Sequence, residues 1–112
     1  MFAVIYRSYI LPNKEAEYKS FWRQIANHFV QHRGALGSNL HKTEAGYWLA
    51  YSVWPDRETR DASWPGEGDV PEDLPEEIRH AIYGVKGCLD DKEAFPEICM
   101  NLVDGTLYDS VN

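Results

Sequence analysis

Residues 2–11 alternate between two sets of side chains, which is the pattern of a β-strand. One set would lie on one face of the strand: Phe2, Val4, Tyr6, Ser8 and Ile10. The other set would lie on the opposite face: Ala3, Ile5, Arg7, Tyr9 and Leu11. Pro12 follows and ends the pairing because proline has no backbone N–H. The sequence therefore predicts a strand over 2–11 that is mostly apolar on both faces.

A long amphipathic helix is predicted next. Its apolar side chains recur at helical spacing: Tyr18, Phe21, Trp22, Ile25 and Phe29. Asn13 is the predicted N-cap, and Glu15 and Glu17 are favourably placed in the first turn. Gly34 is typical of the residue that ends a helix.

The middle of the chain predicts a hairpin and a short helix. A weaker strand over 35–43 is joined by a turn over 44–46 to a strand rich in aromatic residues, 47–54. Asp56 is the predicted N-cap of a short helix that runs to about Ser63 or Trp64. Residues 65–77 contain six acidic and no basic residues, with three prolines and two glycines, and predict an acidic surface loop or flap.

One more helix and a last strand follow. Asp73, with Glu76 three residues later, resembles a capping box, and the predicted helix runs to about Leu89, with Gly84 and Gly87 weakening its end. Residues 98–107 predict the last strand, in which Asp104 and Gly105 would form a bulge or a turn. With no repeat and no linker, this order predicts a single domain over 1–112. Its fold class is α+β, with a ferredoxin-like four-stranded antiparallel sheet and the helices on one face.

The second face of this sheet is predicted to be apolar as well. Tyr47, Leu49, Tyr51 and Val53 share one side of the third strand, and Ile5 adds to it from the first. A sheet face in water should be polar, and two helices can cover only one face. The pattern therefore favours a homodimer that buries this face between two copies. The alternative is that these aromatic residues are partly exposed and have no partner.

Charge and composition exclude several classes of partner. The 112 residues carry 11 Lys and Arg against 18 Asp and Glu, a net charge of −7, which disfavours nucleic acid and anionic membranes. No apolar run is long enough for a membrane helix, and the first ten residues do not resemble a signal peptide. Cys88 and Cys99 have neither metal-ligand nor disulfide-scaffold spacing, so a reduced, cytoplasmic protein is expected.

The run from Gly34 to Ser63, GALGSNLHKTEAGYWLAYSVWPDRETRDAS, resembles the central signature of the antibiotic biosynthesis monooxygenase-like proteins of the dimeric α+β barrel superfamily. The likeness extends to the strand YRSYILP and to the long helix with Glu15 near its start. The resemblance implies two sheets packed face to face in a dimeric barrel. It also implies a pocket in each protomer between the other sheet face and the helices.

Two positions depart from the cofactor-free oxygenases of that family. Those enzymes carry an Asn four residues before the Trp that ends strand three, and a Tyr six residues after it. Trp54 matches the Trp, whereas Ala50 and Arg60 occupy the other two positions.

The resemblance directs one face of the aromatic strand into the pocket. Trp48, Ser52 and Trp54 would form an aromatic wall with one hydroxyl, and Trp22 and Trp64 would complete the lining of a site for a small aromatic ligand. The alternative is that these are ordinary core aromatics beneath the helices.

His28 and Arg7 are the candidate catalytic residues. A cofactor-free oxygenase needs a base that titrates near neutral pH, and His28 is of the suitable type. Arg7 could bind a phenolate or carboxylate. As alternatives, His28 with His32 forms a solvent-facing pair rather than a metal site, and Arg7 pairs with an acid at the strand end.

The leading hypothesis is a monooxygenase without metal or organic cofactor that acts on an aromatic or quinol-like molecule. A non-catalytic dimeric barrel that binds a small molecule is the alternative. A haem-degrading enzyme is a third possibility, in which Trp64 would contribute and His80 would be the haem ligand. A helix-packing or surface histidine is the other interpretation of His80.

Overall fold

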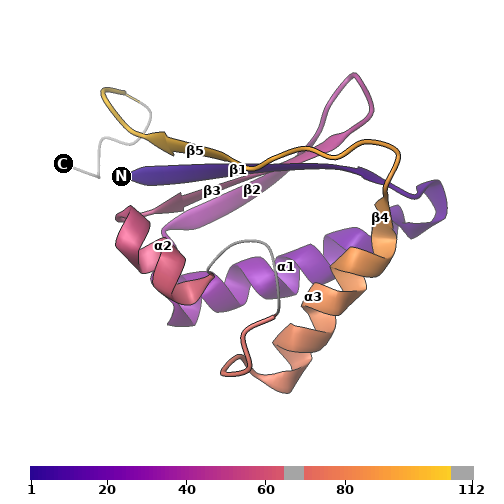
Figure 1. Ribbon diagram of the computed structural model, residues 1–112, viewed down its shortest axis with the longest axis horizontal. Helices are drawn as coiled ribbons and strands as arrows, with labels where there is room; N and C mark the ends of the chain where they lie inside the picture. Colours follow the sequence, from indigo (N-terminus) through magenta and orange to yellow (C-terminus); the bar gives the residue numbers. More distant parts are fainter. Residues whose placement is uncertain (65–69, 107–112) are drawn as a thin grey trace.

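One antiparallel sheet carries the helices on one of its faces in the computed structural model, which describes residues 1–64 and 70–106 (Figure 1). The strands are β1 (Phe2–Ile10), β2 (Gly37–Lys42), β3 (Trp48–Trp54), β4 (Leu89–Asp90) and β5 (Ile98–Asn101). The helices are α1 (Glu15–His32), α2 (Arg57–Ser63) and α3 (Glu76–Cys88), with a 3-10 turn, η1, at Pro12–Lys14. The predicted α+β class, with helices on one face, is confirmed.

The sheet has five strands rather than the predicted four. Its order is β2-β3-β1-β4, and β5 also pairs with β1. The chain passes directly from α3 into β4, which pairs with Tyr9 and Ile10 at one end of β1. The strand β5 pairs with residues 2–5 at the other end. Two short strands therefore pair with β1 after α3, where the sequence predicted a single last strand.

Local signals placed some helix ends correctly. Gly34 follows α1 with φ of +84°, a left-handed conformation that favours glycine. The Asp56 carboxylate accepts a hydrogen bond of 2.7 Å from the backbone N–H of Thr59 at the start of α2, as predicted. Both signals act within a few residues, which is why sequence spacing revealed them.

Two predicted N-caps are wrong. Asn13 lies inside η1, and Lys14 precedes α1 without a side-chain cap. Asp73 does not cap α3; its carboxylate forms an ion pair of 3.1 Å with Arg33 at the end of α1. A long-range ion pair thus replaces the local capping bond predicted for Asp73.

Part of the predicted acidic loop is core. Val70 and Leu74 are each 4% exposed and pack with Ile78 and Ile82 of α3. The segment 70–75 is a turn without helix or strand in which Glu72 and Asp73 are exposed, while its two large apolar side chains are buried against the helix. Residues 65–69 of the predicted flap lie outside the described residues.

The last strand is shorter than the predicted 98–107. After Asn101 the chain leaves the sheet, and the Asp104 carboxylate accepts a hydrogen bond of 2.8 Å from the N–H of Gly105. Residue 107, the predicted end, lies outside the described residues.

The sheet face opposite the helices, here called the far face, is partly covered within the protomer. Phe95, from the connector between β4 and β5, lies 5.8 Å from the ring of Tyr9 and 5.2 Å from that of Tyr47. The guanidinium of Arg7 lies over the Phe95 ring at 4.9 Å. The half-buried apolar side chains of this face include those of Ile5, Leu49, Tyr51 and Val53.

Gly84 allows α1 and α3 to approach closely. A Cβ at this position would lie 2.5 Å from the ring of Phe21 on α1. We therefore expect Gly84→Ala to lower the free energy of unfolding by about 1 kcal/mol net, because an overpacking cost of about 1–3 kcal/mol exceeds the gain in helix propensity. Chemical denaturation measures the change.

Gly87→Ala on the same helix is the matched control. No atom lies within 4 Å of a Cβ built there. This variant should instead gain up to about 1 kcal/mol from helix propensity. Equal effects of the two substitutions would contradict the close approach at Gly84.

Candidate functional site

A cavity of about 270 Å³, partly open to solvent, lies between the helix-side face of the sheet and the helices. Alternation along the strands directs Tyr6 and Ser8 of β1, and Ala50, Ser52 and Trp54 of β3, into it. Helix α1 lines the side of the cavity opposite the sheet with six residues: Tyr18, Trp22, Ile25, Ala26, Phe29 and Val30. The remaining lining residues are Ala35, Ser38, Trp64, Ile82, Val85, Lys86 and Leu89. We call this space the inner cavity.

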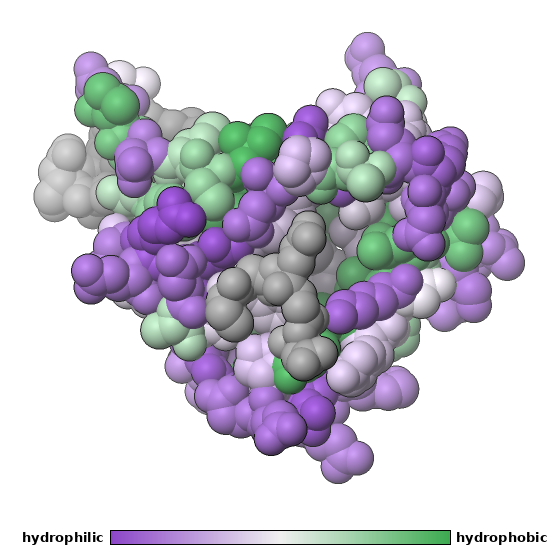
Figure 2. Space-filling model, viewed as in Figure 1, coloured by the Kyte–Doolittle hydropathy of each residue, from purple (hydrophilic) through white to green (hydrophobic). Residues whose placement is uncertain are grey.

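Aromatic rings form much of its wall. Phe29 of α1 lies 6.1 Å from Trp54 and 6.2 Å from Trp64, measured between ring centroids. The Trp54 side chain is only 3% exposed, and its indole N–H donates a hydrogen bond of 3.2 Å to the hydroxyl of Ser52. Such a wall suits a flat apolar molecule. Figure 2 shows hydrophilic residues over most of the helices' outer surface, with hydrophobic residues along and beneath the sheet.

Tyrosine hydroxyls add polar groups to this wall. The Tyr6 hydroxyl accepts a hydrogen bond of 3.2 Å from Arg60, which leaves its own proton available to donate. Burial raises the pKa of Tyr6 against the opposing effect of Arg60. Burial, with a contribution from Cys88, raises the pKa of Tyr18 to about 12. Both phenols are therefore neutral near pH 7 and can donate hydrogen bonds but cannot act as bases.

Tyr6 is held by a charge network around the buried Arg60, which the sequence analysis did not predict. Arg60 of α2 is 2% exposed and donates hydrogen bonds to Glu97 at 2.5 Å and to Asp61 at 3.0 Å, in addition to Tyr6. In the sequence, Arg60 stood out only because it occupies the position where the cofactor-free oxygenases carry a Tyr, six residues after the Trp that ends strand three. Its partners could not be predicted, because Tyr6 is 54 residues away and Glu97 is 37 residues away.

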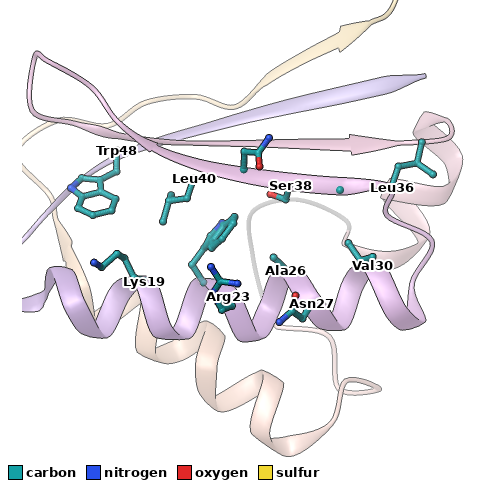
Figure 3. Close-up of a pocket in the computed structure, with 12 residues that line it drawn as sticks. Lys19, Arg23, Ala26, Asn27, Val30, Leu36, Ser38, Leu40 and Trp48 are labelled. Carbon is teal, nitrogen blue, oxygen red and sulfur yellow. The ribbon is translucent and has the colours of Figure 1, made fainter. Parts of the chain in front are cut away.

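A larger groove, of about 530 Å³, adjoins the inner cavity between α1 and β2 (Figure 3). Trp22, Ala26, Val30 and Ser38 line both spaces. The other lining residues are Lys19, Arg23, Asn27, Leu36, Gly37, Asn39, Leu40 and Trp48. We call this space the outer groove; it leads from the sheet edge at β2 toward the inner cavity.

Four of the predicted pocket residues come together around the inner cavity: Trp22, Ser52, Trp54 and Trp64. Trp48 points to the same side of the sheet but lines the outer groove, with its ring 5.5 Å from that of Tyr18. Trp54 also belongs to the core, where it packs with Phe2, Val4 and Ala35. The predicted aromatic wall and the alternative of core packing thus both describe Trp54.

The two candidate catalytic residues are not among the described residues that line either space. Arg7 lies on the far face, where it donates a hydrogen bond of 3.2 Å to the carbonyl of Pro96. The ring of His28 lies 4.9 Å from that of His32 on α1. Burial, with smaller contributions from His32 and Arg33, lowers the pKa of His28.

His80, the candidate haem ligand, is exposed on α3 and contacts Phe21 edge to face at 6.0 Å. It is also absent from the described lining of both spaces. Within residues 1–64 and 70–106, no cluster of three or more His, Cys, Asp or Glu side chains is placed to hold a metal ion. None of the described helices is both long and apolar enough to span a membrane.

Comparison with known proteins supports the fold. No protein-family model matches the sequence, and no curated protein is significantly similar. A solved structure called an antibiotic biosynthesis monooxygenase is 17% identical over 93% of this chain and 100% of its own, with a TM-score of 0.67. A protein from Chloroflexus aurantiacus, provisionally given the same name, is 13% identical over 94% of this chain and 95% of its own, with a TM-score of 0.68. Another from Deinococcus radiodurans, also named provisionally, is 14% identical over 95% and 96%, with a TM-score of 0.67.

The fold and the cavity define an α+β domain with an apolar site beneath its sheet. More specifically, the chain has the fold of the antibiotic biosynthesis monooxygenase-like proteins, and the resemblance drawn from residues 34–63 is confirmed at this level. A shared fold does not carry the activity with it.

Proposed function

We propose that this protein is a cofactor-independent monooxygenase that oxidises an aromatic or quinol-like small molecule in the inner cavity. The observation that carries the proposal is the cavity itself, which is lined by Trp22, Trp54 and Trp64 together with the hydroxyl-bearing residues Tyr6 and Ser52. The fold shared with structures named monooxygenases supports it.

The residues of the cavity suit such a reaction. In a cofactor-free monooxygenation the substrate supplies all the electrons: one oxygen atom enters its ring and the other leaves as water. A phenol reacts more readily once its proton has passed to solvent water, so donors that stabilise the resulting oxyanion lower the barrier. The neutral hydroxyl of Tyr6, held by Arg60, is such a donor. The apolar walls would exclude water from the reacting ring.

Oxygen uptake with a panel of hydroquinones and naphthols tests the proposal. Ala26→Phe is the blocked variant, because Ala26 lines both the inner cavity and the outer groove. We expect uptake with at least one member of the panel and a loss of about tenfold or more in Ala26→Phe, since the new ring would fill the passage between the two spaces.

Ala16→Phe is the matched control, since Ala16 is an exposed residue of the same helix. It should retain the uptake of the unmodified protein. Absence of uptake throughout the panel, or uptake unchanged in Ala26→Phe, would contradict catalysis in this cavity.

A non-catalytic binding protein is the second candidate. The observation that favours it is that the described lining of the inner cavity contains no histidine and no carboxylate, and so no base that titrates near neutral pH. Such a protein would bind the aromatic compounds of the panel, with binding lost in Ala26→Phe, but would consume no oxygen.

We also propose that two copies pair through the far face. The half-buried apolar side chains of this face, from Ile5, Leu49, Tyr51 and Val53, would remain in contact with water in a monomer. A second copy related by twofold symmetry would cover them with an identical surface. Phe95 covers only the end of the face near Tyr9 and Tyr47.

A further inference from the structure

The outer groove is basic, although the protein as a whole is acidic. Lys19 and Arg23 line it, one helical turn apart on α1, and no Asp or Glu is among the described residues that line the groove or the inner cavity. In a chain with a net charge of −7, a lining with cations and no described acid is a marked local asymmetry.

These two cations have no ion pair within the described part of the chain. In contrast, carboxylates pair with each of the following: Lys14, Arg33, Lys42, Arg57 and Arg60. The acid that interacts with Lys19, Glu15, is bound to Lys42 at 2.8 Å. That hydrogen bond is the main cause of the lowered pKa of Glu15, and Lys19 is a minor one.

The cations stand beside an opening and not on an isolated surface. In Figure 3, Lys19 extends from α1 below Trp48 of β3, and Arg23 lies on α1 below the stretch of β2 that holds Leu40 and Ser38. Because Trp22, Ala26, Val30 and Ser38 line both spaces, a molecule with its ring in the inner cavity would extend through the groove past these cations.

We propose that the ligand is an aromatic carboxylic acid, whose ring occupies the inner cavity and whose carboxylate binds Lys19 and Arg23 in the outer groove. This rests on the proposed function, in which the inner cavity binds an aromatic molecule. A guanidinium matches a carboxylate with paired N–H donors, and an adjacent ammonium adds a second charge. Both side chains are exposed, so they also attract anions from solution before the ring is buried.

Calorimetric titration of 2-naphthoate and its neutral methyl ester tests this proposal. We expect the acid to bind about tenfold more tightly than the ester at about 20 mM salt, because a charged hydrogen bond contributes roughly the free energy of one decade in affinity. The preference should fall several-fold at about 300 mM salt, where exposed charges are screened.

Lys19→Gln/Arg23→Gln should lose the preference for the acid and leave the affinity for the ester unchanged. Lys14→Gln/Lys92→Gln is the matched control: it removes the same charge from residues that lie outside the lining of both spaces, and it should retain the preference. This comparison separates a local carboxylate site from an effect of net charge.

The outcomes separate the two proposals. If the ester binds as tightly as the acid, or if Lys19→Gln/Arg23→Gln retains the preference, the carboxylate site is wrong while aromatic binding in the inner cavity stands. If neither compound binds, aromatic binding fails and the carboxylate site fails with it.

Discussion

Glu97→Ala is expected to lower the free energy of unfolding by about 3 kcal/mol, because it leaves the guanidinium of Arg60 buried without its main partner. Arg60 is 2% exposed and the Glu97 side chain 26% exposed, so water would replace only part of the lost carboxylate's interaction. The expected loss is at the lower end of the range for a broken buried ion pair, since Asp61 keeps its contact of 3.0 Å with Arg60. Chemical denaturation measures it.

Two further variants make this result specific. Glu93 is an exposed acid in the same connector, and Glu93→Ala should change stability by no more than about 0.5 kcal/mol. Arg60→Met/Glu97→Met removes both charges and should recover most of the loss, because apolar side chains of similar volume often replace a buried pair at little cost. If Glu97→Ala were as stable as Glu93→Ala, the network would not stabilise the fold.

Tyr51→Asp is expected to convert the proposed dimer into a monomer. Tyr51 lies in the middle of the far face, where its register partners on the neighbouring strands are Ile5 and Asn39, neither of which is a cation. A carboxylate buried there without a partner costs about 3–5 kcal/mol, and twofold symmetry places two of them in one interface. The dimer affinity should fall by about a thousandfold or more.

Sedimentation velocity over a range of concentrations distinguishes the two states. Because Tyr51 is only half-buried within one protomer, the new carboxylate stays hydrated in the monomer, and the far-ultraviolet circular dichroism should be unchanged. Gln24→Asp adds the same charge on the exposed side of α1 and should leave the dimer intact. A monomeric unmodified protein would overturn the proposed pairing, and a dimeric Tyr51→Asp would place the interface elsewhere.

The order of elements was predictable from the sequence because strand and helix periodicities are local properties. The alternation over 2–11 and the apolar spacing from Tyr18 to Phe29 correspond to β1 and α1. The turn at Gly34 and the cap at Asp56 involve residues only a few positions apart. The aromatic side chains of 47–54 were likewise assigned to two faces by alternation alone.

The composition of the site was predictable only in part. Ser52 and Trp54 reach the inner cavity because alternation fixed their face, and Trp22 reaches it from the apolar stripe of α1. Arg7 and His28 were predicted to be catalytic because of their chemistry. Whether a side chain reaches the cavity, however, depends on how the helices and strands pack against one another. The structure places neither of them among the described residues of the cavity lining.

The amino-acid sequence by itself determined the order of strands and helices, the two apolar faces of the sheet and the overall negative charge. Each of these depends on neighbouring residues or on composition. Only the tertiary structure decided that Arg60 donates hydrogen bonds to both Tyr6 and Glu97. It also decided that Asp73 forms an ion pair with Arg33 instead of capping α3. Contacts between residues 37 to 54 positions apart depend on the packing of whole elements, and no local spacing in the sequence encodes them.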